Sequence, residues 1–581
     1  MTMLTIIGMA MVWMGWLLFA GTFLGLGSLL LGNLTDAAGK WRLTTAFWCG
    51  FAVLIFVLQI TNLFSGIGPR TSASLIVVGL CGLFIHRSRF ALVDFLPLWK
   101  PILLLVCLVW LSNRALQAPI YDDSGIYHFS SIRWANQMPL VPGLGNLHGR
   151  LAFNQSYFLF VAFLNNFPMA GFGHNLANSL LLSAGMLTVF EMSAASEPDN
   201  VFGTLIRLLL PITLFFVATC HRSNAPVISS PSPDAAVFTV EIVLTALLLD
   251  FLRCPEIAKI DHSTTMAAIV CLASVSVSLK LSALAFVGAT LVSAIALAVR
   301  QRGWFSTLKT TVLSGFAVLF GVIWILRSVL ASGYLVYPLT ASGLPVDWKI
   351  PEHLVRDELN GIRGYARLPS NHWSEATGSW GWFPQWLVRM ADRPDIIAPL
   401  GLISVCLICW RFFDGRSLRQ IPSSAKPLSC LLGIGLISLA FWFWNAPDPR
   451  FLGAALWIMV LAIVGIALDS ITPERRAAMS RVVFFLFWLS VVLCFVRNGL
   501  ALTISTEGKL AQPIPAPVLT TRITRSGLVV HTPLPGSYCW DCALPCTPYF
   551  RSQLKLRGNS LAKGFSIDES IEQAPAHPIV K

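Results

Sequence analysis

The feature that most constrains this chain is a long succession of apolar runs, each about long enough to cross a bilayer. A hydrocarbon core of about 30 Å requires roughly 20 apolar residues per helix, and helices satisfy their backbone hydrogen bonds internally. Of the 581 residues, 55% are apolar and only 12% are charged, so these runs dominate the chain. The sequence therefore predicts an all-α polytopic membrane protein. Its expected spans are residues 3–31, 43–63, 72–86, 101–117, 174–193, 201–220, 234–252, 263–279, 281–299, 310–330, 396–412, 428–445, 451–468 and 482–501.

The basic residues of the loops predict how these spans are oriented. Lys and Arg gather in the loops that follow the first, third, seventh, ninth, eleventh and thirteenth spans. Basic loops remain on the cytoplasmic side, which places the N-terminus outside. The net charge of +13 is then loop charge and indicates no nucleic-acid partner. We expect a multi-pass protein of the bacterial inner membrane whose external loops face the periplasm.

This topology divides the chain into five segments. They are residues 1–92 with three N-terminal helices, a core at 93–332 with a first external loop at 118–173, an external segment at 333–395, helices at 396–504 and an external Pro- and Cys-containing tail at 505–581. The topology closes only if the apolar stretch 150–168 does not cross the membrane. Because this stretch carries four amide side chains, we expect a helix lying at the membrane interface.

The external segments contain most of the charged and titratable residues that could bind a substrate or take part in catalysis. The stretch YDDSGIYHF supplies Asp122, Asp123 and His128 directly after a span. Further candidates are His148, Arg150, Asp234, Lys280, Arg327, Asp448 and Arg450. Each has an ordinary alternative, since charged residues at helix ends are often solvated. Asp234 could instead cap the helix that begins there, and Asp123 could cap the following helix SGIYHFSSIRWA.

Taken together, these residues suit a substrate that is part lipid and part anion. Arg and Lys side chains hold phosphate at a membrane surface. Replacing that phosphate at a sugar carbon by an acceptor hydroxyl requires a general base, and an Asp within reach serves that role. Basic groups would stabilise the charge that develops on the leaving phosphate. We expect Asp122, Asp123 and Asp234 to be catalytic and the other seven to bind substrate.

Three cysteines, Cys539, Cys542 and Cys546, lie close together in the tail as CWDCALPC. An external tail would favour a disulfide. Unpaired thiols and a metal site remain alternatives, although zinc would need a fourth ligand that the sequence does not supply.

Four segments resemble the GT-C glycosyltransferases, multi-spanning enzymes that use polyprenyl-phosphate-linked sugars. They are the acidic motif YDDSGIYHF, the helix around LAFNQSYFLFVAFL, the acid Asp234, and WILRSVLASGYLVYP before the long external segment. The eleven spans counted from residue 101 are similar to the core of that class. The stretches VPGLGNLHGRLAFNQS and CWDCALPCTPYF also resemble an uncharacterised family of bacterial membrane proteins.

The resemblance to GT-C enzymes implies specific roles. Asp122 or Asp123 would activate the acceptor, with Asp122 favoured, and Arg327 would bind phosphate. Some members bind a divalent metal between acids of the first two external loops, so such a cofactor stays open here. Lys280, Arg450 and His148 are candidates from their position alone.

Three functions follow as hypotheses. The preferred one is inverting transfer of a sugar from a polyprenyl-phosphate carrier to a glycan or lipid acceptor on the periplasmic face. An O-antigen ligase or polymerase would depend less on the acid pair and would use a diphosphate carrier. A flippase or transporter would need charged residues near the bilayer midplane, and the expected spans hold few.

Overall fold

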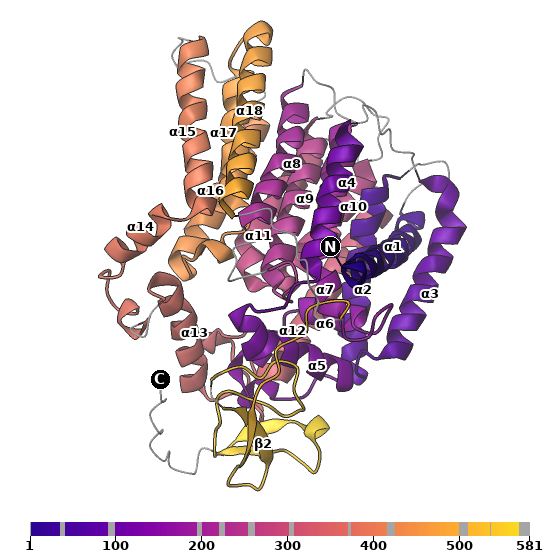
Figure 1. The fold of residues 1–581 in the computed structure, drawn as a ribbon, viewed down its shortest axis with the longest axis vertical. Helices are drawn as coiled ribbons and strands as arrows, with labels where there is room; N and C mark the ends of the chain where they lie inside the picture. The colour runs from indigo at the N-terminus through magenta and orange to yellow at the C-terminus, as the bar shows by residue number, and fades with distance from the viewer. Residues whose placement is uncertain are drawn as a thin grey trace.

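The computed structural model describes residues 2–34, 41–90, 99–194, 200–219, 227–253, 262–300, 307–369, 373–414, 425–498, 509–534 and 536–568. Within these residues, ten helices are long and apolar enough to cross a membrane. They are α1 (Met3–Gly32), α2 (Leu43–Phe64), α3 (Pro69–His86), α7 (Gly173–Ala194), α8 (Val201–Thr219), α9 (Pro233–Arg253), α12 (Thr307–Ser332), α15 (Pro394–Asp414), α16 (Ala425–Asn445) and α18 (Pro473–Asn498). The protein is therefore an all-α polytopic membrane protein (Figure 1).

Four shorter apolar helices complete the bundle. They are α4 (Trp99–Ala115), α10 (His262–Leu279), α11 (Leu284–Arg300) and α17 (Ala455–Asp469). Every expected span coincides with one of these long or shorter helices. The remaining α-helices are α5 (Phe129–Gln137), α6 (Tyr157–Leu164), α13 (Glu352–Arg367) and α14 (Phe383–Ala391).

The three N-terminal helices are packed into the bundle. Helices α1 and α2 approach so closely that a Cβ atom on Gly27 would lie 1.8 Å from the carbonyl oxygen of Ala46. Only glycine permits this contact between backbones. On its other side α2 packs against α10 and α12. The N-terminal helices thus share one hydrophobic core with the helices that follow.

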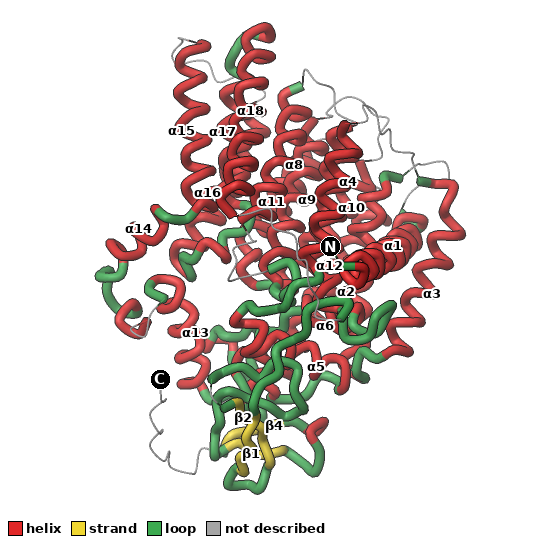
Figure 2. The backbone as a smooth tube through the Cα atoms, viewed as in Figure 1, coloured by secondary structure: helices red, strands yellow, loops and turns green. Residues whose placement is uncertain are grey.

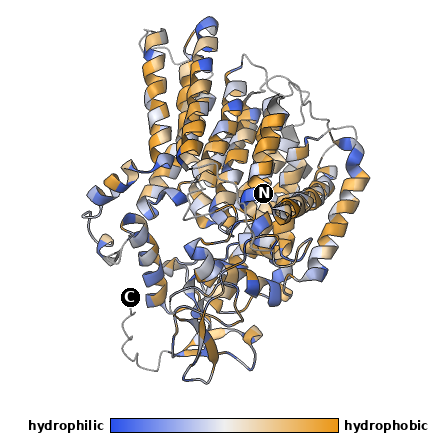
Figure 3. Ribbon diagram, in the orientation of Figure 1, coloured by the Kyte–Doolittle hydropathy of each residue, from blue (hydrophilic) through white to orange (hydrophobic). Residues whose placement is uncertain are grey.

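The segments expected to be external all gather at one end of the bundle, which we call the tail end. It comprises residues 118–172, 333–369, 373–393, 509–534 and 536–568. In Figures 1 and 2, α5, α13 and the strands of the tail lie in the lower part of the molecule, and α14 lies at the lower end of α15. The long helices are coloured mostly as hydrophobic in Figure 3, whereas α13 carries many hydrophilic residues. The basic loops at 254–261, 301–306 and 415–424 lie outside the described residues. The structure separates the predicted external segments from the opposite end of the bundle.

One expectation about this end is wrong. The stretch 150–168 does not cross the bundle, but it does not form an interfacial helix either. Its one α-helix is α6, of eight residues, and every one of them is buried. The ring of Phe160 packs against Phe23 and Phe51 of the N-terminal helices. The amides predicted to face headgroups are used inside the protein; for example, Asn154 donates to the carbonyl of Trp324.

The tail folds into two small antiparallel sheets. Strand β1 (Leu519–Ile523) pairs with β2 (Val529–Pro533), and β3 (Leu554–Leu556) pairs with β4 (Phe565–Ile567). Its backbone is tied to the first loop by hydrogen bonds from Trp540 N–H to Gly125 and from Phe565 N–H to Pro142. The tail therefore covers the acidic motif. Residues 569–581 lie outside the described part of the chain.

Candidate functional site

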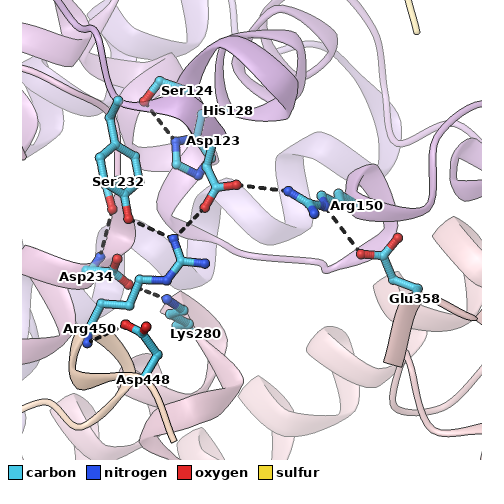
Figure 4. A network of polar contacts seen from close by, with 11 residues as sticks. Asp123, Ser124, His128, Arg150, Ser232, Asp234, Lys280, Glu358, Asp448 and Arg450 are labelled. Atoms are coloured by element: carbon cyan, nitrogen blue, oxygen red, sulfur yellow. Dashed lines mark hydrogen bonds and ion pairs between the residues drawn. The ribbon is translucent and has the colours of Figure 1, made fainter. Parts of the chain in front are cut away.

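Asp123 is the centre of a network of polar side chains at the tail end. One carboxylate oxygen accepts from Arg150 Nη1 at 2.9 Å, and the other accepts from Arg450 Nη1 at 2.9 Å (Figure 4). Asp123 has helical backbone angles and makes no side-chain capping bond to the π-helix that follows, Ser124–His128. The expectation that it caps this helix is therefore wrong. Its side chain instead joins two arginines that are 300 residues apart in sequence.

Arg450 is held in place by several groups. Its guanidinium donates to the hydroxyl of Tyr121 at 2.8 Å and lies 4.5 Å from the ring centroid of Phe451. Its backbone N–H donates to Asp448, whose other carboxylate oxygen accepts from Arg389 at 2.9 Å. Asp448, predicted to bind substrate, thus fixes the turn that carries Arg450.

Asp234 and Lys280 form a further ion pair beside Arg450. Asp234 lies in the first turn of α9, and Lys280 lies in the tight connection after α10. The hydroxyl of Ser232 accepts the N–H of Asp234 at 3.4 Å, so Ser232 provides the contact expected of a helix cap. The ammonium of Lys280 lies 4.3 Å from the Phe451 ring, which also contacts Arg450. Both cations therefore contact the same phenyl ring.

Arg150 links this cluster to an acid that sequence reasoning missed. Its Nε donates to Glu358 on α13 at 3.3 Å, while Nη1 holds Asp123. A Cβ on Gly149 would lie 3.0 Å from a Glu358 oxygen, which shows how closely α13 approaches the first loop. Glu358 stands in a charged amphipathic helix, and no local pattern distinguishes it from the neighbouring acids. Only the tertiary fold brings it to Arg150.

The two predicted histidines are buried. His128 shares a hydrogen bond of 3.1 Å between its Nδ1 and the hydroxyl of Ser124, and burial lowers the pKa of His128 to about 3. His148 lies beneath Tyr549 of the tail, at 5.0 Å between ring centroids. Burial also lowers the pKa of His148 well below its ordinary value, and Arg150 and Arg551 add to this effect. Both imidazoles are therefore neutral at pH 7.

The structure places Arg327 apart from the network. It is 4% exposed on α12 and donates to the carbonyl of Gln59 at 3.0 Å and to Asn62 at 3.1 Å, both on α2. A small cavity of about 50 Å³ lies beside it, and Arg150 also lines this cavity. In this structure the role of Arg327 is to join α12 to α2.

The two adjacent aspartates have different surroundings. Asp123 has a side chain that is 17% exposed and is bound to two arginines, whereas Asp122 is exposed. Asp122 accepts a hydrogen bond of 3.0 Å from the hydroxyl of Tyr538 in the tail. Asp122 was the favoured base from sequence, yet Asp123 is the one that lies among the cations.

The electrostatics of the network follow from burial and pairing. Burial raises the pKa of Asp123, but Arg450 and Arg150 outweigh it, so this pKa lies well below its usual range. Burial lowers the pKa of Arg450, but Tyr121 and Asp123 outweigh that effect and raise it. For Glu358, by contrast, burial dominates over Arg150 and the pKa is raised. Asp123 and Arg450 are therefore held in their charged forms.

A divalent metal does not fit the acids as they stand. Asp123 is neutralised by two arginines and Asp234 by Lys280, so their oxygens are directed at cationic side chains. Among the described residues, the one group of three or more metal-type ligands that converges is Cys539, Cys542 and Cys546. Two of these, Cys539 and Cys546, form a disulfide, and Cys542 is a free thiol. This arrangement agrees with the disulfide alternative.

Comparison with known proteins adds one finding. A family model described as a domain of unknown function, DUF8201, matches residues 9–457. The matched segment includes every residue of the polar network and ends before the tail. No curated protein and no solved structure matches the chain.

Proposed function

The chain belongs to the DUF8201 family, and we propose that it is a membrane glycosyltransferase that moves a sugar from a polyprenyl-phosphate carrier to an acceptor hydroxyl. The observation that carries this proposal is the position of Asp123 between Arg150 and Arg450, beside the Asp234–Lys280 pair. An ionised carboxylate among cations, at the end of a bundle of membrane helices, suits a substrate with a lipid chain and a phosphate.

The network supports a sequence of exchanges. Arg450 and Lys280 contact the same ring, so a phosphate bound to both would replace carboxylate oxygens as their partner. Asp123 would lose part of the interaction that lowers its pKa, and burial would then raise that pKa and make the carboxylate a stronger base. The basicity of Asp123 would therefore increase only when the donor phosphate is bound.

The reaction itself is a single displacement. The acceptor oxygen forms a bond to the anomeric carbon while the bond from that carbon to the phosphate oxygen breaks. Asp123 takes the hydroxyl proton, and the phosphate leaves with the electron pair, stabilised by Arg450 and Lys280. One displacement inverts the anomeric configuration. The tail end would face the periplasm, as the basic loops predict.

The test uses the full-length protein in lipid nanodiscs with a panel of polyprenyl-monophosphate sugars and an envelope extract as acceptor. Released polyprenyl phosphate is counted by mass spectrometry. We expect Asp123→Asn to reduce release by about 10²- to 10⁴-fold, the usual contribution of a general base. Asp250→Asn, at the opposite end, is the matched control and should retain release.

Two outcomes would contradict the proposal. Full activity of Asp123→Asn would show that Asp123 is not the general base. Release from a diphosphate-linked glycan but from no monophosphate donor would identify a ligase instead.

A further inference from the structure

We propose that Asp122, Tyr365 and Tyr538 form the binding site for the acceptor and that the acceptor is a carbohydrate. This inference rests on the proposed transferase function and specifies its second substrate. The three residues come from the first loop, from α13 and from the tail. Tyr538 binds Asp122, Tyr365 lies next to Arg450 of the cationic network, and the two tyrosines are close enough to influence each other electrostatically.

Their positions are fixed by direct contacts. The hydroxyl of Tyr538 donates to Asp122 at 3.0 Å, and the ring of Tyr365 lies 5.7 Å from the guanidinium carbon of Arg450. Burial raises the pKa of Tyr538, and Asp122, Asp123 and Tyr365 raise it further. The surface patch is therefore continuous with Arg450 and Asp123.

The tail holds Tyr538 as a rigid platform. A Cβ on Gly125 would lie 2.8 Å from the ring of Tyr538 and 2.9 Å from that of Trp540, so both rings press on the backbone of the acidic motif. Trp540 N–H donates to the Gly125 carbonyl at 2.9 Å, and Arg133 binds Asp541 at 2.9 Å. This explains why a tail outside the family match could belong to the site.

The exposed chemistry indicates the class of ligand. Tyr365 is 48% exposed and Tyr538 is 37% exposed, although rings around them, such as Tyr127 and Phe129, are buried. An aromatic face binds the C–H face of a sugar ring, and a phenol or carboxylate binds its hydroxyls. Within the described chain, Asp122 has no ion pair, so its carboxylate can accept further hydrogen bonds. The acyl chain of a lipid acceptor has no hydroxyl groups to donate hydrogen bonds to this carboxylate.

The experiment separates acceptor binding from donor chemistry. Full-length protein in nanodiscs is given a polyprenyl-phosphate sugar with either short envelope oligosaccharides or a long-chain alcohol as acceptor. We expect Tyr365→Ala and Tyr538→Ala each to raise the KM for oligosaccharide roughly tenfold, near the upper limit for one aromatic contact. In Tyr538→Ala, hydrolysis of the donor without acceptor should stay within about twofold of the native rate, since Tyr538 contacts Asp122 and Trp540 and not the cations that would hold the phosphate.

Two further variants sharpen the result. Tyr538→Phe keeps the ring and removes the hydrogen bond to Asp122, so the KM should rise by only about threefold. Tyr549→Ala is the control, because Tyr549 is a 41% exposed tail tyrosine that contacts His148 instead of the patch. It should change neither KM nor hydrolysis.

Calorimetric titration with the same oligosaccharides distinguishes failure of this site from failure of the proposed function. If no donor is consumed but oligosaccharide binds and Tyr365→Ala weakens binding, the site stands and the transferase proposal fails. Unchanged KM in both alanine variants, transfer only to the alcohol, or no binding of oligosaccharide to the native protein would each overturn the site. Melting curves of each variant confirm that it is folded.

Discussion

The two ends of the bundle both contain buried ion pairs, but they use them differently. At the opposite end, Arg42 binds Asp250 at 2.6 Å, and Glu191 accepts the backbone N–H groups of Leu43 and Thr44. These contacts begin α2 and join it to α7 and α9, as a carboxylate at a helix N-terminus does. At the tail end, Asp123 shares two arginines, and one of these also holds a second acid.

The difference lies in how many partners each acid has. Among the described residues Asp250 is paired with Arg42 alone, and this contact fixes two helices. A shared network can exchange partners when a new anion enters, because Arg150 and Arg450 each have more than one acceptor in reach. Burial of a charged pair is therefore no sufficient sign of a site. Sharing of partners between separate segments is the more informative observation.

The largest effect on stability is expected when an acid at the opposite end is removed, and this tests whether that ion pair has a structural role. The side chain of Asp250 is 6% exposed and that of Arg42 is 18% exposed. Asp250→Asn removes the charge of the buried carboxylate that Arg42 binds and should cost about 3 kcal/mol of stability, the lower end for breaking a buried pair. Thermal unfolding in detergent measures this loss.

Activity then decides whether the two ends are separate. Sugar transfer per folded molecule should be unchanged in Asp250→Asn and lost in Asp123→Asn. If Asp250→Asn also loses transfer while folded, the opposite end takes part in function and the contrast drawn above is wrong.

The second prediction concerns the disulfide, a feature of the tail end. Cys539 and Cys546 are separated by 7 residues, and closing so short a loop contributes about 2.5 kcal/mol in the chain-entropy account. Cys539→Ser should lower the local stability of the tail by about this amount. Hydrogen exchange should accelerate in the tail and leave the helices of the bundle unchanged.

Cys542→Ser is the matched control because Cys542 is a free thiol in the same loop. It should exchange like the native protein. Equal acceleration in the two variants would mean that the disulfide adds nothing beyond packing of the cysteine side chains.

The sequence predicted the helices well because their signal is local. Each apolar run needs only its own residues to form a hydrogen-bonded helix in lipid. Prediction was weaker at the tail end, where long-range contacts decide the structure. Asp122 was favoured over its neighbour, and Arg327 was placed at the site, whereas the structure directs it to α2.

The missed residues share one property. Glu358 stands in no motif, and Tyr121 and Tyr538 stand in or beside motifs that were singled out for their acids and cysteines; the partners that make all three important lie far away in the chain. Arg150 and Glu358 are 208 positions apart, and Tyr538 and Asp122 are 416 apart. Loop segments have no periodic pattern from which such pairings can be inferred.

The smallest predicted effect is on the pH dependence of stability. It distinguishes His128, which is buried at the tail end, from His86, which is half-buried at the opposite end. Burial lowers the pKa of His128 from its ordinary 6.5 to about 3, against the opposing effect of Asp123 and Asp234. The folded protein therefore binds this proton less tightly than the unfolded chain, so the stability from neutral His128 is full above pH 6.5 and is lost as the pH falls toward 3. Between pH 6.5 and 5.5 the loss is about 1 kcal/mol.

His128→Gln should show a shallower decline of melting temperature over this range, while His86→Gln at the end of α3 should decline like the native protein. Parallel declines for native protein and His128→Gln would show that acid sensitivity comes from other groups and not from the imidazole packed against the acidic motif.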